Sequence, residues 1–117
     1  MPVGDLDHLY YWTRDLEVAV RFYRDAVGLT LVRRDGDAWA RFEAGSVGFA
    51  LHATEEESPV GSGTAVFRVE DLEAARWTLE QRGVRFEEQT GEVEGFARFA
   101  TFRDPDGNPV QIIEYLP

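Results

Sequence analysis

The two halves of this chain repeat one short pattern of residues, and this repeat limits the possible folds more than any other feature. Each half begins its pattern with Asp-Leu-Glu and an alanine two residues further on. Three segments correspond at shifts of 55 to 57 residues: Asp15-Leu16-Glu17 with Asp71-Leu72-Glu73, Gly28 with Gly83, and Ala40-Arg41-Phe42 with Ala97-Arg98-Phe99. A shift near half of the 117 residues predicts two copies of one structural module.

The order of the predicted elements is the same in both halves. Alternating side chains from Leu6 to Trp12 predict a strand, and helical spacing follows between Asp15, a capping residue, and Gly28. Asp71 and Gly83 bound a second helix in the same way. The other expected strands lie near Leu29–Arg34, Ala38–Phe42 and Val47–Ala53, with a turn at Asp35-Gly36, and near Thr64–Val69, Val84–Gln89, Phe96–Arg103 and Pro109–Tyr115.

The charge and composition of the chain exclude several classes of partner. Its 22 acidic and 12 basic side chains give a formal net charge of -10, which repels nucleic acid. No segment has the ~20 apolar residues of a membrane-spanning helix, and Asp5 and Asp7 stand where a secretion signal would be basic and then apolar. We therefore expect a cytoplasmic protein. The absence of cysteine excludes disulfides, thiolate nucleophiles and sulfur-ligated zinc.

The halves are separated by an acidic run that also contains proline and glycine, from Glu55 to Gly63. This composition predicts a solvated linker at about 55–63. Module one then covers about 4–54 and module two about 64–117, and both belong to a single domain over 1–117.

Two phrases of the sequence resemble a known family. His8 through Asp15, followed by Phe22-Tyr23 and Gly28-Leu29, is similar to its opening strand and helix. Asp104-Pro105-Asp106-Gly107-Asn108, with Gln111 after it, is similar to its closing hairpin and last strand. Together with the duplication, these phrases identify the chain as a member of the glyoxalase/bleomycin resistance protein/dioxygenase (vicinal oxygen chelate) superfamily.

The resemblance implies an α+β fold. Its two tandem βαβββ modules form a cupped, half-barrel mixed sheet around a cavity, with the helices on the convex face. Since side chains alternate along a strand, an inward His8 would place Leu6, Tyr10 and Trp12 inward and turn Leu9 and Tyr11 to the helix. In the second module, Thr64, Val66 and Arg68 would face inward.

The superfamily holds a divalent metal with side chains from the first and last strands of both modules. His8 matches a ligand position and Gln111 is an occasional ligand, whereas Thr64 and Ala50 occupy the other two positions. Two donors are too few for the usual sites, so we prefer no metal. If a divalent metal binds, its ligands would be His8, His52 and Gln111. Glu114 is the alternative ligand, as the carboxylate of a two-histidine, one-carboxylate triad, but it has the opposite parity to Gln111 and would face away unless a bulge intervened.

Without a metal, the resemblance points to the binding branch of the family. We expect a homodimer that binds a small aromatic or apolar anionic molecule, held by arginines among aromatic side chains. The alternative is a divalent-metal-dependent lyase, isomerase or dioxygenase. The candidate ligand-binding residues are His8, Tyr10, Trp12, Trp39, Arg41, His52, Thr64, Arg68, Phe96, Arg98, Gln111 and Tyr115.

Overall fold

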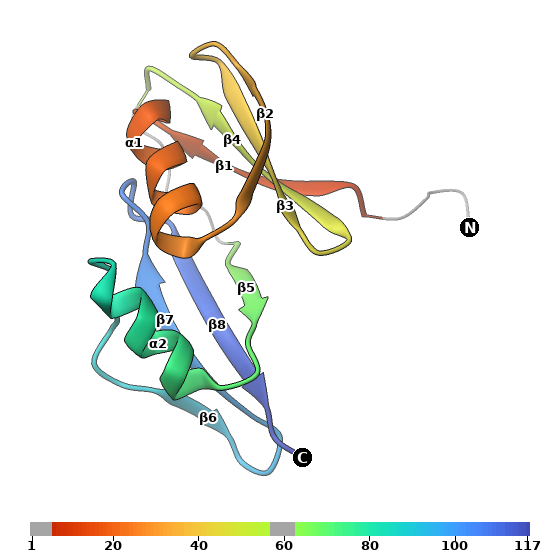
Figure 1. Cartoon of the computed structure of the whole chain (residues 1–117), viewed down its shortest axis with the longest axis vertical. Helices are drawn as coiled ribbons and strands as arrows, with labels where there is room; N and C mark the ends of the chain where they lie inside the picture. The colour runs from red at the N-terminus through yellow and green to blue at the C-terminus, as the bar shows by residue number, and fades with distance from the viewer. Residues whose placement is uncertain (1–5, 57–62) are drawn as a thin grey trace. The chain divides into compact units, whose positions relative to one another are not determined.

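The structure, a computed structural model, describes residues 6–56 and 63–117. The chain divides into two compact units, Met1–Pro59 and Val60–Pro117, and each is described by itself. Figure 1 labels the helices and strands of both. Most of the predicted linker at 55–63 lies outside the described residues.

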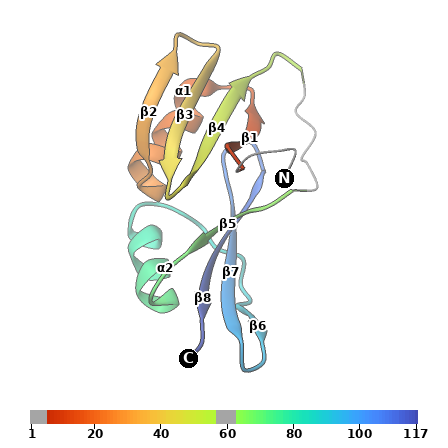
Figure 2. The same ribbon diagram turned by 90° about the vertical axis from the view of Figure 1, so that its right-hand side faces the viewer.

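The first unit is a four-stranded mixed sheet with one helical segment. Its elements are β1 (His8–Thr13), α1 (Leu16–Arg21), a π-helical turn η1 (Phe22–Val27), β2 (Thr30–Asp35), β3 (Trp39–Ala44) and β4 (Val47–Ala53). The strand order is β1-β4-β3-β2, with β1 parallel to β4 and the other neighbours antiparallel. Figure 2 shows β2, β3 and β4 side by side, with α1 behind them.

The helical segment of the first unit begins and ends where the sequence predicts, but it changes from an α-helix to a π-helix within the segment. The carboxylate of Asp15 accepts a hydrogen bond from the backbone N–H of Val18 at 3.1 Å, which caps α1. Gly28 ends the segment with φ 94°, a left-handed conformation that glycine adopts without strain. The prediction of one regular helix is wrong for Phe22–Val27, which forms a π-helical turn.

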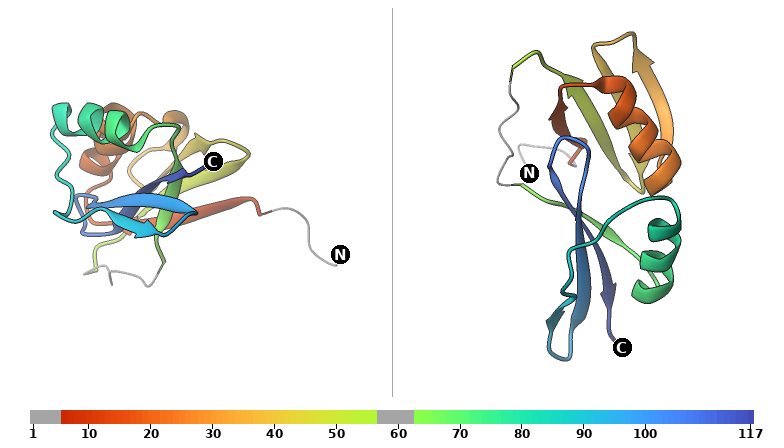
Figure 3. Two further views of the ribbon diagram at one scale, coloured as in Figure 1. Left: turned by 90° about the horizontal axis from the view of Figure 1, so that it is seen from below. Right: turned by 90° about the vertical axis from the view of Figure 1, so that its left-hand side faces the viewer.

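The core of the first unit lies between the helical segment and one face of the sheet. Tyr23 is fully buried, and its ring centroid lies 4.7 Å from that of Phe49. Figure 3 (right) shows α1 lying across this face. The other buried apolar residues of this layer are Leu16, Ala19, Val20, Ala40, Phe42 and Leu51.

The second unit repeats this arrangement. Its elements are β5 (Ala65–Arg68), α2 (Leu72–Gln81), β6 (Gly91–Val93), β7 (Ala97–Arg103) and β8 (Pro109–Tyr115), and its strand order is β5-β8-β7-β6. Asp71 caps α2 by accepting from the N–H of Ala74 at 3.1 Å. Figure 3 (left) shows α2 over one face of this sheet. The buried apolar side chains include Leu72, Leu79, Ala100, Phe102, Val110 and Ile112.

The predicted strand at Val84–Gln89 is wrong. Only Phe86 forms a bridge, to Phe102, and the strand that pairs with the outer side of β7 is β6. Two apolar side chains of this segment nevertheless pack inward: Val84 is 5% exposed, and the ring centroid of Phe86 lies 5.1 Å from that of Phe102. The apolar side chains therefore pack on the core while most of the backbone leaves the sheet.

The two units confirm the predicted α+β class and the two tandem βαβββ modules. In each unit, the first strand lies at the edge of the sheet and pairs in parallel with the last strand. The last strand in turn pairs antiparallel with the strand before it in the sequence. No helix in residues 6–56 and 63–117 is long and apolar enough to cross a membrane. The single cavity enclosed by both modules stays a prediction.

Candidate functional site

The strand register sorts the predicted site residues of the first unit onto one face of its sheet. Tyr10 pairs with Ala50 and Trp12 with His52 between β1 and β4, and residues directly opposite each other share a face. The alternate residues Tyr11 and Phe49 contact each other on the helix side, at 5.6 Å between ring centroids. The face away from α1, called the first open face, carries His8, Tyr10, Trp12, Arg33, Asp35, Trp39, Arg41, Glu43, Ala50 and His52.

Aromatic rings of β1 and β4 meet on the first open face, beside a tryptophan of β3. The ring centroid of Tyr10 lies 4.3 Å from that of His52 and 5.5 Å from that of Trp12. Trp39 on β3 pairs directly with His52 on β4. Tyr10 is 46% exposed and Trp12 is 41% exposed, so these rings form an accessible surface rather than a core.

The polar groups of this aromatic cluster are available to a ligand. No hydrogen bond joins the hydroxyl of Tyr10, the indole N–H of Trp39 or the ring of His52 to a residue in the described part of the chain. Burial, and secondarily the charge of His8, lowers the pKa of His52 below its ordinary value. A neutral imidazole offers one hydrogen-bond donor and one acceptor.

A cationic and anionic network lies beside the rings. The guanidinium of Arg41 donates to the carboxylate of Asp7 at 3.0 Å, and Asp7 also bonds Nδ1 of His8 at 2.7 Å. The hydrogen bond from His8, and then that from Arg41, lowers the pKa of Asp7. Arg41 also lies over Gly48, where a Cβ atom would come within 2.5 Å of the guanidinium.

Arg33 was not among the predicted site residues. It stands opposite Arg41 in the β2–β3 register, and its guanidinium carbon lies 5.6 Å from the centre of the Trp39 ring. A bulge between Leu31 and Arg33 reverses the side-chain alternation, so these two residues lie on opposite faces. Simple alternation along the sequence could not have placed Arg33 on the open face.

The second unit has an open face of its own on the side away from α2. Arg68 lies over the ring of Tyr115, at 4.8 Å, and the ring of Phe96 contacts Tyr115 at 5.3 Å. Gln111 donates to the hydroxyl of Thr101 at 3.1 Å. The predicted candidate Thr64 is exposed and precedes β5.

The predicted inward orientation of Arg98 is wrong. Arg98 lies on the helix side, with its guanidinium 3.5 Å from Glu114 and 4.0 Å from Glu73. Glu114 in turn accepts from the backbone N–H of Leu72 at 2.7 Å, at the start of α2. Glu114 therefore faces away from Gln111, as its parity predicts.

The register explains the error at Arg98. Arg41 pairs with Ala50 in the first unit, and Thr101 pairs with Gln111 at the matching place in the second. The structural counterpart of Ala40-Arg41-Phe42 is therefore Ala100-Thr101-Phe102, not Ala97-Arg98-Phe99. The similarity at a shift of 57 misplaces the arginine by three residues, and an odd shift turns a strand residue to the other face.

The described donors do not assemble a metal site within one unit. His8 and His52 share the first open face, but the third candidate, Gln111, belongs to the second unit. Across residues 6–56 and 63–117, no three His, Cys, Asp or Glu side chains group as they would around an ion. Two imidazoles fall short of the usual number of protein ligands.

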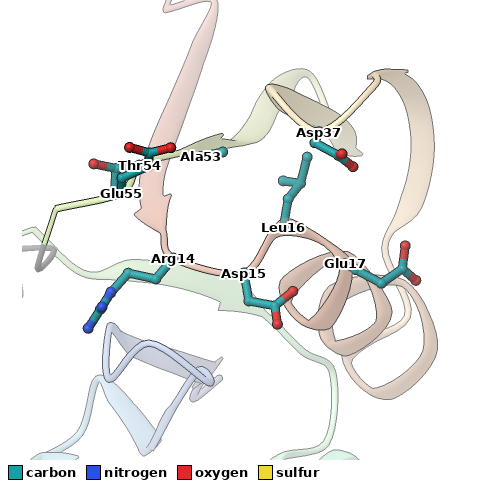
Figure 4. Close-up of a pocket in the computed structure, with 8 residues that line it drawn as sticks. All are labelled: Arg14, Asp15, Leu16, Glu17, Asp37, Ala53, Thr54 and Glu55. Carbon is teal, nitrogen blue, oxygen red and sulfur yellow. The ribbon is translucent and has the colours of Figure 1, made fainter.

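A shallow depression lies elsewhere in the first unit, where β1 leads into α1 (Figure 4). Its volume is about 450 Å³, and none of the predicted site residues lines it. Two of its carboxylates already serve the fold, because Asp15 caps α1 and Glu17 pairs with Arg21 and Arg34. The aromatic open face remains the candidate site.

Known proteins share this fold over nearly the whole chain. Lactoylglutathione lyase from Agrobacterium tumefaciens superposes with a TM-score of 0.82 at 22% identity, covering 97% of this chain and 96% of the other. TnmS3, an antibiotic binding protein from Streptomyces sp. CB03234, superposes with a TM-score of 0.83 at 24% identity, covering 99% of both chains. At these identities the likeness shows a common fold.

Sequence similarity goes further than the fold. The uncharacterized protein YraH of Bacillus subtilis (strain 168) is 31% identical over an alignment that covers 87% of this chain and 91% of that protein. Residues 5–112 match the family model of the Glyoxalase/Bleomycin resistance protein/Dioxygenase superfamily. The chain therefore belongs to the Glyoxalase/Bleomycin resistance protein/Dioxygenase superfamily.

Proposed function

We propose that this protein binds a small, planar or partly apolar molecule that carries a negative charge, and that it does so without a metal. The observation that carries the proposal is the accessible ring cluster of Tyr10, Trp12 and His52 on the first open face, with Trp39 on the neighbouring strand opposite His52. Aromatic side chains give large contact areas at a small cost in side-chain entropy, and their polar edges orient the ligand.

Arginine side chains on the open faces could bind an anion. Arg41 and Arg68 both lie there, and Arg68 stacks on Tyr115 beside Phe96. A guanidinium above an aromatic ring presents its planar fork to a carboxylate or phosphate while the ring offers a stacking surface. Arg98 is no longer a ligand candidate, since its guanidinium faces Glu73 and Glu114.

Proteins of the same fold include both a binding protein and an enzyme, and the residues at this chain's metal-ligand positions favour a binding role. TnmS3 is an antibiotic binding protein, and its fold matches this chain over 99% of both sequences. A metal-dependent lyase, isomerase or dioxygenase needs several protein ligands for its metal. At two of the family's ligand positions this chain has Ala50 and Thr64, which do not replace an imidazole or a carboxylate. We therefore place the binding role ahead of the enzymatic one.

A ligand screen tests the binding proposal. Thermal-shift and fluorescence titrations with aromatic acids, their neutral amides and aromatic amines should give stabilisation by acids that grows as RT ln(1 + [L]/Kd). Tyr10→Ala and Trp12→Ala should each raise the Kd for the acids at least tenfold and so reduce that stabilisation. Trp77→Ala is the matched control, because Trp77 is 64% exposed on α2 and lies outside both open faces.

Two outcomes would contradict this function. Equal binding of acids, amides and amines in wild type and both variants would show that the ring cluster does not select the ligand. Elemental analysis of untagged protein is the second measurement. About one equivalent of zinc, nickel, iron or manganese, lost in His8→Ala, would replace the proposal with the metal-dependent enzyme.

We also propose a homodimer, which would give the exposed rings of the open faces a second chain to pack against. Exposed aromatic side chains are enriched at protein interfaces. Light scattering should give twice the monomer mass of 13.3 kDa over a range of concentrations. A monomer mass at every concentration would contradict it.

A further inference from the structure

We propose that Arg33, stacked on Trp39, is the group that recognises the oxyanion of the ligand, whereas Arg41 is already paired with Asp7. This inference rests on the proposed binding function and names the residue that would select the charge. The ligand class is an aromatic ring system with a carboxylate or phosphate at its edge. The ring would stack in the cluster and the oxyanion would meet the guanidinium of Arg33.

The backbone aims Arg33 at the open face by means of a local irregularity. In a regular strand, Arg33 would share a face with Leu31, which pairs with the buried Phe42 on the helix side. The bulge between Leu31 and Arg33 instead places Arg33 opposite Arg41. Bulges often re-aim a side chain at a binding site, at the cost of ladder hydrogen bonds.

Two arginines directly opposite each other are unfavourable in a sheet, because like charges repel. Asp7 neutralises the charge of one of these arginines, since its carboxylate accepts a hydrogen bond from Arg41 at 3.0 Å. No ion pair joins Arg33 to a carboxylate within residues 6–56 and 63–117, although Asp35 and Glu43 share the first open face with it. The Arg33 guanidinium thus keeps its hydrogen-bonding fork for another acceptor.

The position of Arg33 also suits a ligand that stacks on the rings. Its guanidinium lies 5.6 Å from the Trp39 ring, and Trp39 is the cross-strand neighbour of His52. An aromatic acid lying on Tyr10 and His52 would extend toward β3 and β2, where Arg33 stands. Arg41, by contrast, reaches over Gly48 toward Asp7 at the start of β1.

The first test uses iodide, an anionic quencher of tryptophan fluorescence, and needs no ligand. A protein with Trp39 as its single tryptophan (Trp12→Phe, Trp77→Phe) is compared with one that keeps Trp77 alone. The ratio of iodide to acrylamide quenching should be higher at Trp39 than at Trp77. Arg33→Gln should lower iodide quenching of Trp39 roughly twofold at low ionic strength, and salt should remove the difference.

Paired variants separate Arg33 from Arg41. The double variant Asp7→Asn, Arg41→Gln removes one charge of each sign and should leave iodide quenching of Trp39 unchanged. Asp7→Asn alone releases Arg41 from its partner and should increase iodide quenching. If Arg33→Gln leaves iodide quenching of Trp39 unaltered, the inference is wrong, whatever the ligand screen finds.

The second test measures binding of 2-naphthoate and its neutral isostere 2-naphthamide. In the wild type, 2-naphthoate should bind at least tenfold more tightly, and Arg33→Gln should remove that preference while leaving 2-naphthamide unaffected. Arg33→Lys should keep the effect on iodide but recover only part of the preference, because lysine lacks the planar fork. A preference for the acid that survives in Arg33→Gln overturns the inference and leaves the proposed function standing. If neither compound binds, the proposed function fails for this ligand class, and iodide still decides whether Arg33 attracts anions.

Discussion

The turn between β7 and β8 should be the most sensitive polar feature of the second unit, and Asp104→Ala is the substitution that tests it. The carboxylate of Asp104 accepts from the backbone N–H of Asp106 at 2.9 Å and of Asn108 at 2.8 Å, and from the Asn108 side-chain amide at 2.9 Å. Asp104 is 4% exposed and Asn108 is 3% exposed. This turn sets the register that places Gln111 opposite Thr101 on the second open face.

The expected loss follows from which donors can reach water. In Asp104→Ala, the two donors of Asn108 stay buried without their acceptor, and an unsatisfied buried group costs about 1–3 kcal/mol. The N–H of Asp106 is half-buried and can turn to solvent at little cost. We expect the free energy of unfolding to fall by about 3 kcal/mol. Asp104→Asn keeps an oxygen for both backbone donors and should lose only about 1 kcal/mol.

Urea denaturation followed by far-ultraviolet circular dichroism measures both variants. With an m-value of about 1.5–2 kcal/mol/M, Asp104→Ala should lower the midpoint by about 1.5–2 M, and Asp104→Asn by about a third of that. Asp37→Asn is the control, because Asp37 is fully exposed and should leave the midpoint unchanged. A midpoint shift under about 0.5 M for Asp104→Ala, or an equal loss in Asp104→Asn, would refute the reasoning.

Three further predictions follow from other contacts. His52 should titrate below its ordinary pKa in the folded protein, so the unfolded chain binds this proton first and the free energy of unfolding should fall as pH decreases below about 6.5. Proton NMR should show the pKa of His52 rising in Tyr10→Ala, and an unchanged pKa would exclude burial by Tyr10 as the cause of the shift. Arg98→Met should cost about 1–2 kcal/mol in urea denaturation, because it leaves the half-buried Glu114 without its guanidinium, yet it should not change ligand affinity. Asp15→Ala and Asp71→Ala should each cost about 1 kcal/mol in the same assay, since each removes one cap; a loss in one variant alone would show that the two modules are not equivalent.

The features that local chemistry decides could be predicted from the sequence. Asp15 and Asp71 cap the helices, and Gly28 and Gly83 end them with φ of 94° and 90°. Capping and left-handed glycine involve neighbours within a few residues, so the sequence carries the whole signal. The alternation that placed His8, Tyr10 and Trp12 on one face of β1 also held, because that strand pairs without a bulge.

Only the tertiary structure decided which residues face each other between strands. The Ala-Arg-Phe repeat suggested Arg98 as the partner of Arg41, whereas the ladder of β7 and β8 puts Thr101 there. The bulge that brings Arg33 to the open face leaves no mark on the alternation of the sequence. Phe86 likewise packs on Phe102 without continuing a strand. Strand register depends on the backbone hydrogen bonds and packing of two segments distant in sequence, and a shift of one or three residues reverses the face of a side chain. The sequence therefore determined the modules and their order, and the pairing of distant strands determined which side chains form the candidate site.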